Sequence, residues 1–239
     1  MNQEIKNNII EEYFKNIGLQ EGEDYTEFLE ELREKHGNQV VGALNNAMSM
    51  RNGNSSSNKI YKLKNDNLQL SIDFSAYSAN LYKSYFGWLI TNDDLNPKNI
   101  LDIGCDNGIV TCFYALLYPN AKVVGVDKEK KGIECGIELA KKLNLTNVEF
   151  KIMDGKKVDK IFDKNQFDLI VSVRSLLEIL MIPEPKRVWT LEERLKSPIV
   201  SNSINKSFNS IKKIMSEDAK FITFERLGCI DNILDFVNI

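Results

Sequence analysis

From residue 98 onward, short apolar runs alternate with amphipathic stretches, and this alternation restricts the possible folds more than any other feature of the chain. Five apolar runs have the length of β-strands: 99–103, 122–127, 148–154, 167–173 and 220–226. Three helical patterns lie between them: 108–118, 129–143 and 203–215. Near-continuous apolar strands separated by helices are typical of a parallel sheet that is buried on both faces. We therefore predict an α/β fold with a Rossmann-like, doubly wound, mostly parallel sheet and helices on both faces.

The N-terminal part of the chain has a different pattern. Apolar residues recur at helical spacing over 2–51 and again over 76–91, and the polar stretch 52–58 predicts a loop. Apolar and polar residues alternate over 60–72 around three central polar residues, which predicts a β-hairpin. Two domains are therefore predicted: 1–95, a helical segment plus hairpin that serves as a cap or an interaction module, and 96–239, a ligand-binding α/β domain.

One segment, 180–202, interrupts the alternation of strands and helices. It contains Pro183, Pro185 and Pro198 and follows the fourth predicted strand. Insertions at this point of an α/β sheet lie over the edge where ligands bind, so we predict an insertion beside the site. Residues 230–238 then predict the start of one more helix.

Composition excludes several classes of protein. The chain has 239 residues, 31 Lys and Arg against 34 Asp and Glu, and a formal net charge of −3, which does not favour nucleic acid as the partner. No run of 18 apolar residues and no secretory leader are present, so we predict no membrane partner and a cytoplasmic location. Four cysteines without a CxxC pair and a single histidine, His36, argue against a metal site and a histidine-dependent triad.

The motif ILDIGCDNG carries most of the chemical information. Its strand ends near Asp102, and Gly104 permits a tight turn before Gly108 opens the next helix. The second strand ends at Asp127, about 20 residues after Gly104, where an acid can accept hydrogen bonds from both hydroxyls of a ribose. The third strand ends at Asp154. These acids are predicted to lie along the carboxyl edge of the sheet, which is where such sheets bind ligands.

The motifs ILDIGCDNG, VVGVD, VEFKIMDG and FDLIVS, in this order, resemble those of the class I S-adenosylmethionine-dependent methyltransferases over about residues 98–227. The resemblance implies an enzyme of that activity with S-adenosylmethionine as cofactor. In that family the first loop wraps the methionine part, the second-strand acid holds the ribose and the third-strand acid meets the adenine amino group. The cofactor-binding residues that the resemblance implies are Asp102, Gly104, Cys105, Asp106, Gly108, Asp127, Lys128, Met153, Asp154, Gly155 and Ser172.

The chain departs from the family at Asp106, where the family usually has glycine. The alternative interpretation, a nicotinamide-binding unit, also requires glycine there, because GxGxxG lets a pyrophosphate approach the helix. A carboxylate at this position would repel a pyrophosphate, whereas methionine carries no phosphate. Asp106 therefore favours S-adenosylmethionine over a dinucleotide, although it is expected to reshape the loop.

Candidate catalytic residues follow the fourth strand. Glu178 is predicted to act as a base and Arg174 to orient an acidic group of the acceptor. The alternative is a structural Arg–Glu pair at i and i+4 on a helix surface. The aromatic residues that precede the first strand are expected to pack in the core, except for one tyrosine at the helix start; they are Tyr77, Tyr82, Tyr85 and Trp88.

The near-neutral charge favours a small-molecule acceptor. Two alternatives stay open: an RNA or protein methyltransferase that binds the macromolecule with residues 1–95, and a non-catalytic cofactor-binding module. A homodimer is compatible with the sequence. The family's sheet continues past the fifth strand, whereas this chain ends at Ile239 inside a predicted helix. We therefore expect a truncated chain that lacks the last strands, the alternative being a partner that covers the exposed edge.

Overall fold

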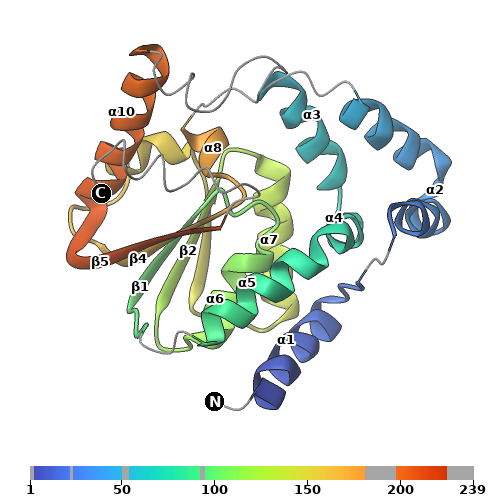
Figure 1. Ribbon diagram of the computed structural model, residues 1–239, viewed down its shortest axis with the longest axis horizontal. Coiled ribbons are helices and arrows are strands. Elements are labelled where there is room, and N and C mark those ends of the chain that lie inside the picture. The colour runs from blue at the N-terminus through green and yellow to red at the C-terminus, as the bar shows by residue number, and fades with distance from the viewer. Residues whose placement is uncertain (1–2, 22–23, 50–53, 92–94, 181–197, 225–239) are drawn as a thin grey trace.

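A single sheet of five parallel strands organises the fold (Figure 1). The computed structural model describes these parts of the chain: 3–21, 24–49, 54–91, 95–180 and 198–224. The strand order across the sheet is β3-β2-β1-β4-β5. The strands are β1 (Asn99–Ile103), β2 (Lys122–Asp127), β3 (Val148–Ile152), β4 (Phe167–Val173) and β5 (Met215–Phe224). The predicted Rossmann-like parallel sheet is thus confirmed.

Helices fill the described part of the chain before β1. They are α1 (Gln3–Ile17), α2 (Tyr25–Ser49), α3 (Asn54–Lys64), α4 (Leu68–Ser75), the 3₁₀ turn η1 (Ala76–Ser78) and α5 (Ala79–Thr91). The helical spacing predicted for 2–51 is confirmed in the described residues. Gly37 interrupts α2 with a φ of 83° and a ψ of 157°, so α2 consists of two helical parts.

The β-hairpin predicted over 60–72 is wrong, because helices α3 and α4 occupy this stretch. Asn67, the last residue of the polar run, has an extended backbone, and its side chain accepts a hydrogen bond of 2.9 Å from the N–H of Leu70. Asparagine is a preferred N-cap, so the run that suggested a hairpin turn starts a helix instead. The loop predicted at 52–58 is also wrong where the structure describes it, since α3 begins at Asn54.

Two layers of helices cover the two faces of the sheet (Figure 1). Successive side chains of β1 point to opposite faces of the sheet. Ile100 belongs to the core formed with α1, α5, α6 and α7, and Leu101 belongs to the core on the other face, formed with η2 and α10. This arrangement confirms helices on both faces. The remaining elements are α6 (Ile109–Leu117), α7 (Lys130–Lys142), η2 (Gly155–Lys160), α8 (Leu176–Ile179) and α10 (Pro198–Ile214).

The N-terminal helices share a hydrophobic core with the sheet. The ring of Phe86 on α5 stacks on Phe113 of α6 with 3.8 Å between the ring centroids. The hydroxyl of Tyr13 on α1 donates a 2.6 Å hydrogen bond to the carbonyl of Ile109. These contacts fix α1 and α5 against α6. They therefore also determine the face of the sheet on which α1 and α5 lie.

Some predicted boundaries differ from the structure. Helix α10 begins at Pro198 and β5 at Met215, both earlier in the chain than predicted. Most of the predicted insertion at 180–202 and the whole helix predicted at 230–238 lie outside the described residues. Within the described ranges, no helix combines the length and the apolar character needed to cross a membrane.

Candidate functional site

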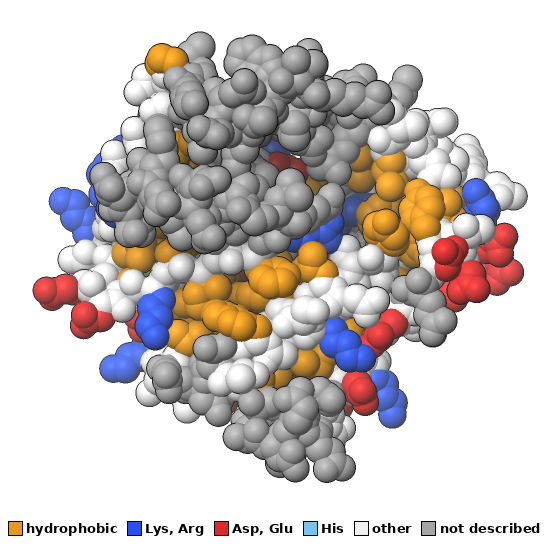
Figure 2. Space-filling model, in the orientation of Figure 1, with side chains coloured by type: hydrophobic (Ala, Val, Ile, Leu, Met, Phe, Trp, Pro, Cys, Tyr) orange, Lys and Arg blue, Asp and Glu red, His pale blue; other side chains and the backbone are white. Residues whose placement is uncertain are grey.

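A pocket of about 720 Å³ lies at the carboxyl edge of the sheet. Residues that follow β1, β2 and β4 line one side of it, and residues of α2, α3, α4, η1 and α5 line the other. Figure 2 shows a hollow near the middle of one face, with basic side chains within it and hydrophobic side chains beside it. Pockets of this size at this edge are typical ligand sites of α/β proteins.

The pocket brings most of the predicted site residues together. Those that line it are Asp102, Gly104, Cys105, Asp106, Asp127, Lys128, Met153, Asp154, Gly155, Arg174 and Glu178. They come from the ends of β1, β2, β3 and β4, so the sheet topology alone accounts for their proximity.

Two predicted residues do not line the pocket. Gly108 begins α6 with a φ of 79°, and a Cβ there would lie 2.8 Å from the ring of Phe150 and 2.9 Å from the Cα of Gly136. Ser172 is fully buried, and its hydroxyl lies 2.7 Å from the hydroxyl of Ser175. The structure thus gives both residues contacts that support the walls of the pocket.

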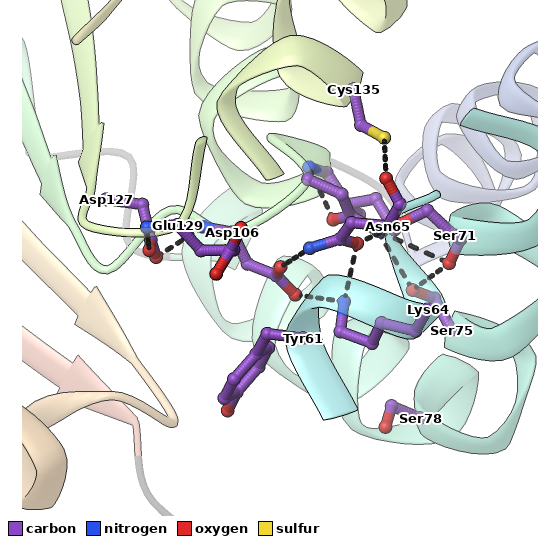
Figure 3. A network of polar contacts seen from close by, with 12 residues as sticks. Tyr61, Lys64, Asn65, Ser71, Ser75, Ser78, Asp106, Asp127, Glu129 and Cys135 are labelled. Carbon is purple, nitrogen blue, oxygen red and sulfur yellow. Dashed lines mark hydrogen bonds and ion pairs between the residues drawn. The ribbon is translucent and has the colours of Figure 1, made fainter. Parts of the chain in front are cut away.

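Asp127 is held by two backbone groups. One carboxylate oxygen accepts a 2.8 Å hydrogen bond from the N–H of Glu129, and the other accepts one of 3.1 Å from the N–H of Asp106 (Figure 3). A carboxylate oxygen has two lone pairs, so each keeps the capacity for one more donor. Burial, together with the charge of Asp106, raises the pKa of Asp127 to about 6.

Asp102 is the most buried acid of the pocket, with 1% of its surface exposed. Its carboxyl group accepts a 2.6 Å hydrogen bond from the hydroxyl of Thr111. Burial raises the pKa of Asp102 to about 7, and the bond from Thr111 opposes this shift. A cation bound in the pocket would stabilise the ionised form of this carboxyl group.

Three successive N–H groups of the turn after β1 are occupied. Gly104 and Cys105 donate to the carbonyl of Val126 at 2.8 and 3.1 Å, and Asp106 donates to Asp127. A phosphate-binding loop needs such N–H groups to point at its ligand. The hydrogen bonding here therefore supports the preference for a cofactor without phosphate.

Gly104 is required by its backbone and its surroundings. Its φ is 82°, and a Cβ would lie 2.4 Å from the Cβ and Oγ of Ser175. The hydroxyl of Ser175 in turn donates a 2.8 Å hydrogen bond to the carbonyl of Ile103. The turn after β1 thus packs directly against the segment that follows β4.

The structure shows how an aspartate is accommodated at position 106, where the family usually has glycine. It has a φ of 48°, the left-handed region that favours glycine, and its side chain compensates through two contacts with the α3–α4 turn. One carboxylate oxygen pairs with Lys64 at 2.5 Å, and the other accepts a 2.7 Å hydrogen bond from the amide of Asn65 (Figure 3). Lys64 and Asn65 are 5% and 2% exposed, so this ion pair is shielded from water on the side of the N-terminal segment.

The contacts of Asp106 continue into a buried polar network (Figure 3). The side-chain oxygen of Asn65 accepts a 2.6 Å hydrogen bond from Ser71, and the amide of Asn107 donates to Ser71 and Ser75 at 2.8 and 3.1 Å. The network joins α3, α4 and the turn after β1. It therefore fixes the N-terminal helices relative to the carboxyl edge of the sheet.

Arg174 and Glu178 both contact the N-terminal helices. Arg174 has a φ of 58° and donates a hydrogen bond to the hydroxyl of Ser78, while Glu178 accepts a 3.3 Å hydrogen bond from Tyr61. Arg174 precedes α8 and is not part of it, so the two residues do not form an i, i+4 pair on one helix. Both side chains belong to the pocket lining.

Sequence reasoning missed most of the pocket residues that the N-terminal segment contributes, among them Lys64. The hairpin predicted over 60–72 gives no reason for Lys64, or for Asn65 in its central polar run, to lie near Asp106. Of the four aromatic residues before β1 that the sequence analysis names, Tyr77 and Tyr82 line the pocket and Tyr85 is fully buried. Trp88 is 44% exposed, so the core packing predicted for it is wrong. Burial raises the pKa of Tyr82 to about 12. The described residues contain no cluster of His, Cys, Asp and Glu that could hold a metal ion.

Comparison with known families identifies the α/β domain. The family model of the methyltransferase domain matches residues 95–227. The chain belongs to this family. The match spans the strands and the strand-end residues of the pocket, and it confirms the resemblance to the class I S-adenosylmethionine-dependent methyltransferases, with the enzyme class and the cofactor that the resemblance implies.

Curated relatives of this methyltransferase domain differ in what they act on. The (S)-tetrahydroprotoberberine N-methyltransferase of Eschscholzia californica is 26% identical over 121 residues, 51% of this chain and 34% of that protein. Ribosomal RNA small subunit methyltransferase C of Buchnera aphidicola is 27% identical over 139 residues, 57% of this chain and 36% of that protein. The chain spans about a third of the length of these curated relatives.

Two solved structures illustrate the similarity of the fold. One, a SAM-dependent methyltransferase from Aquifex aeolicus, has a TM-score of 0.45 and 16% identity over 64% of this chain and 78% of that one. The other, PKMT2 from Rickettsia typhi in complex with AdoHcy, has a TM-score of 0.37 and 25% identity over 52% of this chain and 20% of that one.

The ion pair between Lys64 and Asp106 is expected to stabilise the protein. Replacing Lys64→Met should lower the free energy of unfolding by about 2 kcal/mol, less than the ~3–5 kcal/mol of fully buried pairs because Asp106 keeps 26% of its side chain exposed. In a double-mutant cycle with Asp106→Asn, measured by urea unfolding, the coupling should be about 1 kcal/mol or more. Lys130→Met, which removes an exposed pair with Glu134, is the control and should change stability by less than about 0.5 kcal/mol. Additive effects would contradict a direct interaction.

The raised pKa of Asp102 makes stability depend on pH. Between about pH 4 and pH 7 the folded protein retains a proton that the unfolded chain has released, so the free energy of unfolding falls as pH rises through this window. Asp102→Asn removes this contribution, and the variant should gain stability relative to the unmodified protein from pH 4 to pH 7. Thermal unfolding across this range measures the difference, with the exposed Asp163→Asn as control. Parallel pH profiles for the Asp102→Asn and unmodified proteins would show that Asp102 has an ordinary pKa.

Proposed function

We propose that this methyltransferase transfers a methyl group from S-adenosylmethionine to a small-molecule acceptor. The observation that carries the proposal is the concave shape of the pocket, about 720 Å³ between the strand ends on one side and the N-terminal helices on the other. An acceptor that reaches the strand ends between α3, α4 and the sheet must enter this space, which suits a small molecule better than a duplex or a folded protein. The name of the (S)-tetrahydroprotoberberine N-methyltransferase relative agrees with a small acceptor.

The residues of the pocket fit the cofactor. Asp127 keeps acceptor capacity on both oxygens, which suits the two hydroxyls of a ribose. Asp102 would stabilise the positive charge of the methionine end, and Asp154 with Met153 and Gly155 would hold the adenine. When bound, S-adenosylmethionine supplies a methyl group made electrophilic by the positive sulfur.

Glu178 and Arg174 are proposed to act on the acceptor. In the transfer, a lone pair of the acceptor would displace the sulfur, which would keep the electron pair of its bond to the methyl carbon. Glu178 is placed to accept a proton that the acceptor loses, with Tyr61 fixing its carboxylate. Arg174, held by Ser78, is proposed to orient the acceptor through an acidic group where one is present.

Several sequence predictions stay predictions. They are the division into domains at residue 95, the cytoplasmic location, a homodimer, and the RNA and protein acceptors. The N-terminal segment contributes walls to the pocket, which agrees with the cap that was one of its two proposed roles.

Asp127 should determine the affinity for the cofactor. Replacing Asp127→Ala removes two charged hydrogen-bond acceptors and should weaken binding of S-adenosylhomocysteine at least tenfold, measured by isothermal titration calorimetry. The affinity of the unmodified protein should rise with pH through about 6, as Asp127 ionises. Asp163→Ala, an exposed residue outside the pocket, is the control. Unchanged affinity in Asp127→Ala would reject its role at the ribose.

Glu178 should affect turnover rather than cofactor binding. Glu178→Gln keeps the size of the side chain but removes the base, so the transfer rate should fall about 10²-fold or more for an acceptor that must lose a proton. Transfer of labelled methyl from the cofactor to a small-molecule library, scored by the mass gain of one methyl group, provides the measurement.

The same library tests the proposed acceptor class. If no small molecule in it is methylated and RNA or protein substrates are methylated instead, the proposed small-molecule function is rejected.

A further inference from the structure

Three aromatic side chains line the end of the pocket formed by the N-terminal helices. They are Tyr25 at the start of α2, Phe74 on α4 and Tyr77 on η1, and we call them the aromatic wall. Tyr25 is 40% exposed and Tyr77 is 59% exposed, far more than the other aromatic residues of this segment that pack in the core. Rings that remain open to a pocket offer flat apolar surface to a ligand.

The aromatic wall is held in place from behind. The ring of Tyr77 packs edge-on against Tyr25, with 5.3 Å between the centroids, and lies 5.5 Å from the ring of the buried Phe28. Phe28 also contacts Phe74 edge-on at 6.0 Å. The wall is therefore positioned by one buried ring and loses little conformational freedom when a ligand binds.

The charges around the aromatic wall favour a cation. Asp24, which precedes Tyr25, is exposed at the pocket, and the N–H of Thr26 bonds to its carboxylate at 2.6 Å and lowers its pKa. It therefore stays ionised at neutral pH. The pocket as a whole carries more acids than bases; its charged lining residues are Asp24, Asp102, Asp106, Asp127, Glu129, Asp154 and Glu178 against Lys64, Lys128, Lys156 and Arg174.

We propose that the aromatic wall, with Asp24 and Glu178, binds the methyl acceptor and selects a compound that carries an aromatic ring and an amine. The inference rests on the proposed function and names the substrate class for it. The ring of the acceptor packs on Tyr25 and Tyr77, and the protonated amine is attracted by tyrosine faces and carboxylates. The amine passes its proton to Glu178, and its free lone pair then forms the nitrogen–carbon bond as the carbon–sulfur bond breaks.

Three small probes separate the features that the wall would recognise. They are 2-phenylethylamine, which has a ring and an amine, n-pentylamine, which lacks the ring, and 3-phenylpropionate, which replaces the amine with a carboxylate. Binding to the full chain saturated with S-adenosylhomocysteine is measured by calorimetry or ligand-detected NMR. We expect 2-phenylethylamine to bind at least fivefold more tightly than either of the others. Equal binding of n-pentylamine, or tighter binding of 3-phenylpropionate, would overturn the inference.

Substitutions at Tyr77 test whether 2-phenylethylamine binds at the aromatic wall. Tyr77→Ala should weaken 2-phenylethylamine at least fivefold, whereas Tyr77→Phe keeps the ring and should retain most of the affinity. Ile161→Ala changes a residue that is 61% exposed outside the pocket and should have no effect. Unchanged affinity in Tyr77→Ala would overturn the inference.

The affinity for S-adenosylhomocysteine, measured on the same variants, separates the two proposals. Normal cofactor binding without a preference for aromatic amines rejects only the aromatic wall. If the unmodified protein does not bind S-adenosylhomocysteine, the proposed function is rejected as well.

Discussion

The ion pair between Lys64 and Asp106 is the interaction on which the architecture of the pocket depends. Asp106 belongs to the turn after β1, and its N–H also supports the carboxylate of Asp127. Lys64 belongs to the helices that cover the pocket. One side chain therefore connects the strand-end residues to the opposite wall. Without the pair, a negative charge would remain in a turn whose left-handed backbone already disfavours a residue with a Cβ.

The parallel sheet explains why acids from distant parts of the sequence meet. Strands β1, β2 and β3 are neighbours in the sheet, and their carboxyl ends carry Asp102, Asp127 and Asp154 to one edge. Burial raises the pKa values of Asp102 and Asp127, and the charge of Asp106 adds to the shift at Asp127, so the pocket is prepared for a positively charged ligand. The helices of the N-terminal segment then reduce the access of water to this edge.

The strand-end half of the site could be predicted from the sequence, and the helical half could not. Asp127 and Gly104 lie within strand and turn patterns that are local in sequence, so their places follow from the order of the elements. Lys64 reaches the pocket through tertiary packing that no local pattern records. A tyrosine at the start of the helix predicted over 76–91 is expected outside the core, which agrees with Tyr77, but nothing local indicates which residues surround it. Asn67 gave a misleading signal, because asparagine favours both turns and helix N-caps, and short apolar runs fit helices as well as strands.

The packing around Phe150 has a consequence for how this sequence can vary. Its ring occupies the space that a Cβ would take at Gly108, Gly125 and Gly136, at 2.7 to 2.9 Å. Three backbone segments, from β2, α6 and α7, thus approach one phenyl group. A homologue that introduces a methyl group at position 125 or 136 must shrink or shift the ring, so these two positions are expected to covary with position 150. At Gly108 the left-handed backbone and the Cα of Gly136, 2.9 Å from a Cβ, favour glycine whatever residue stands at position 150.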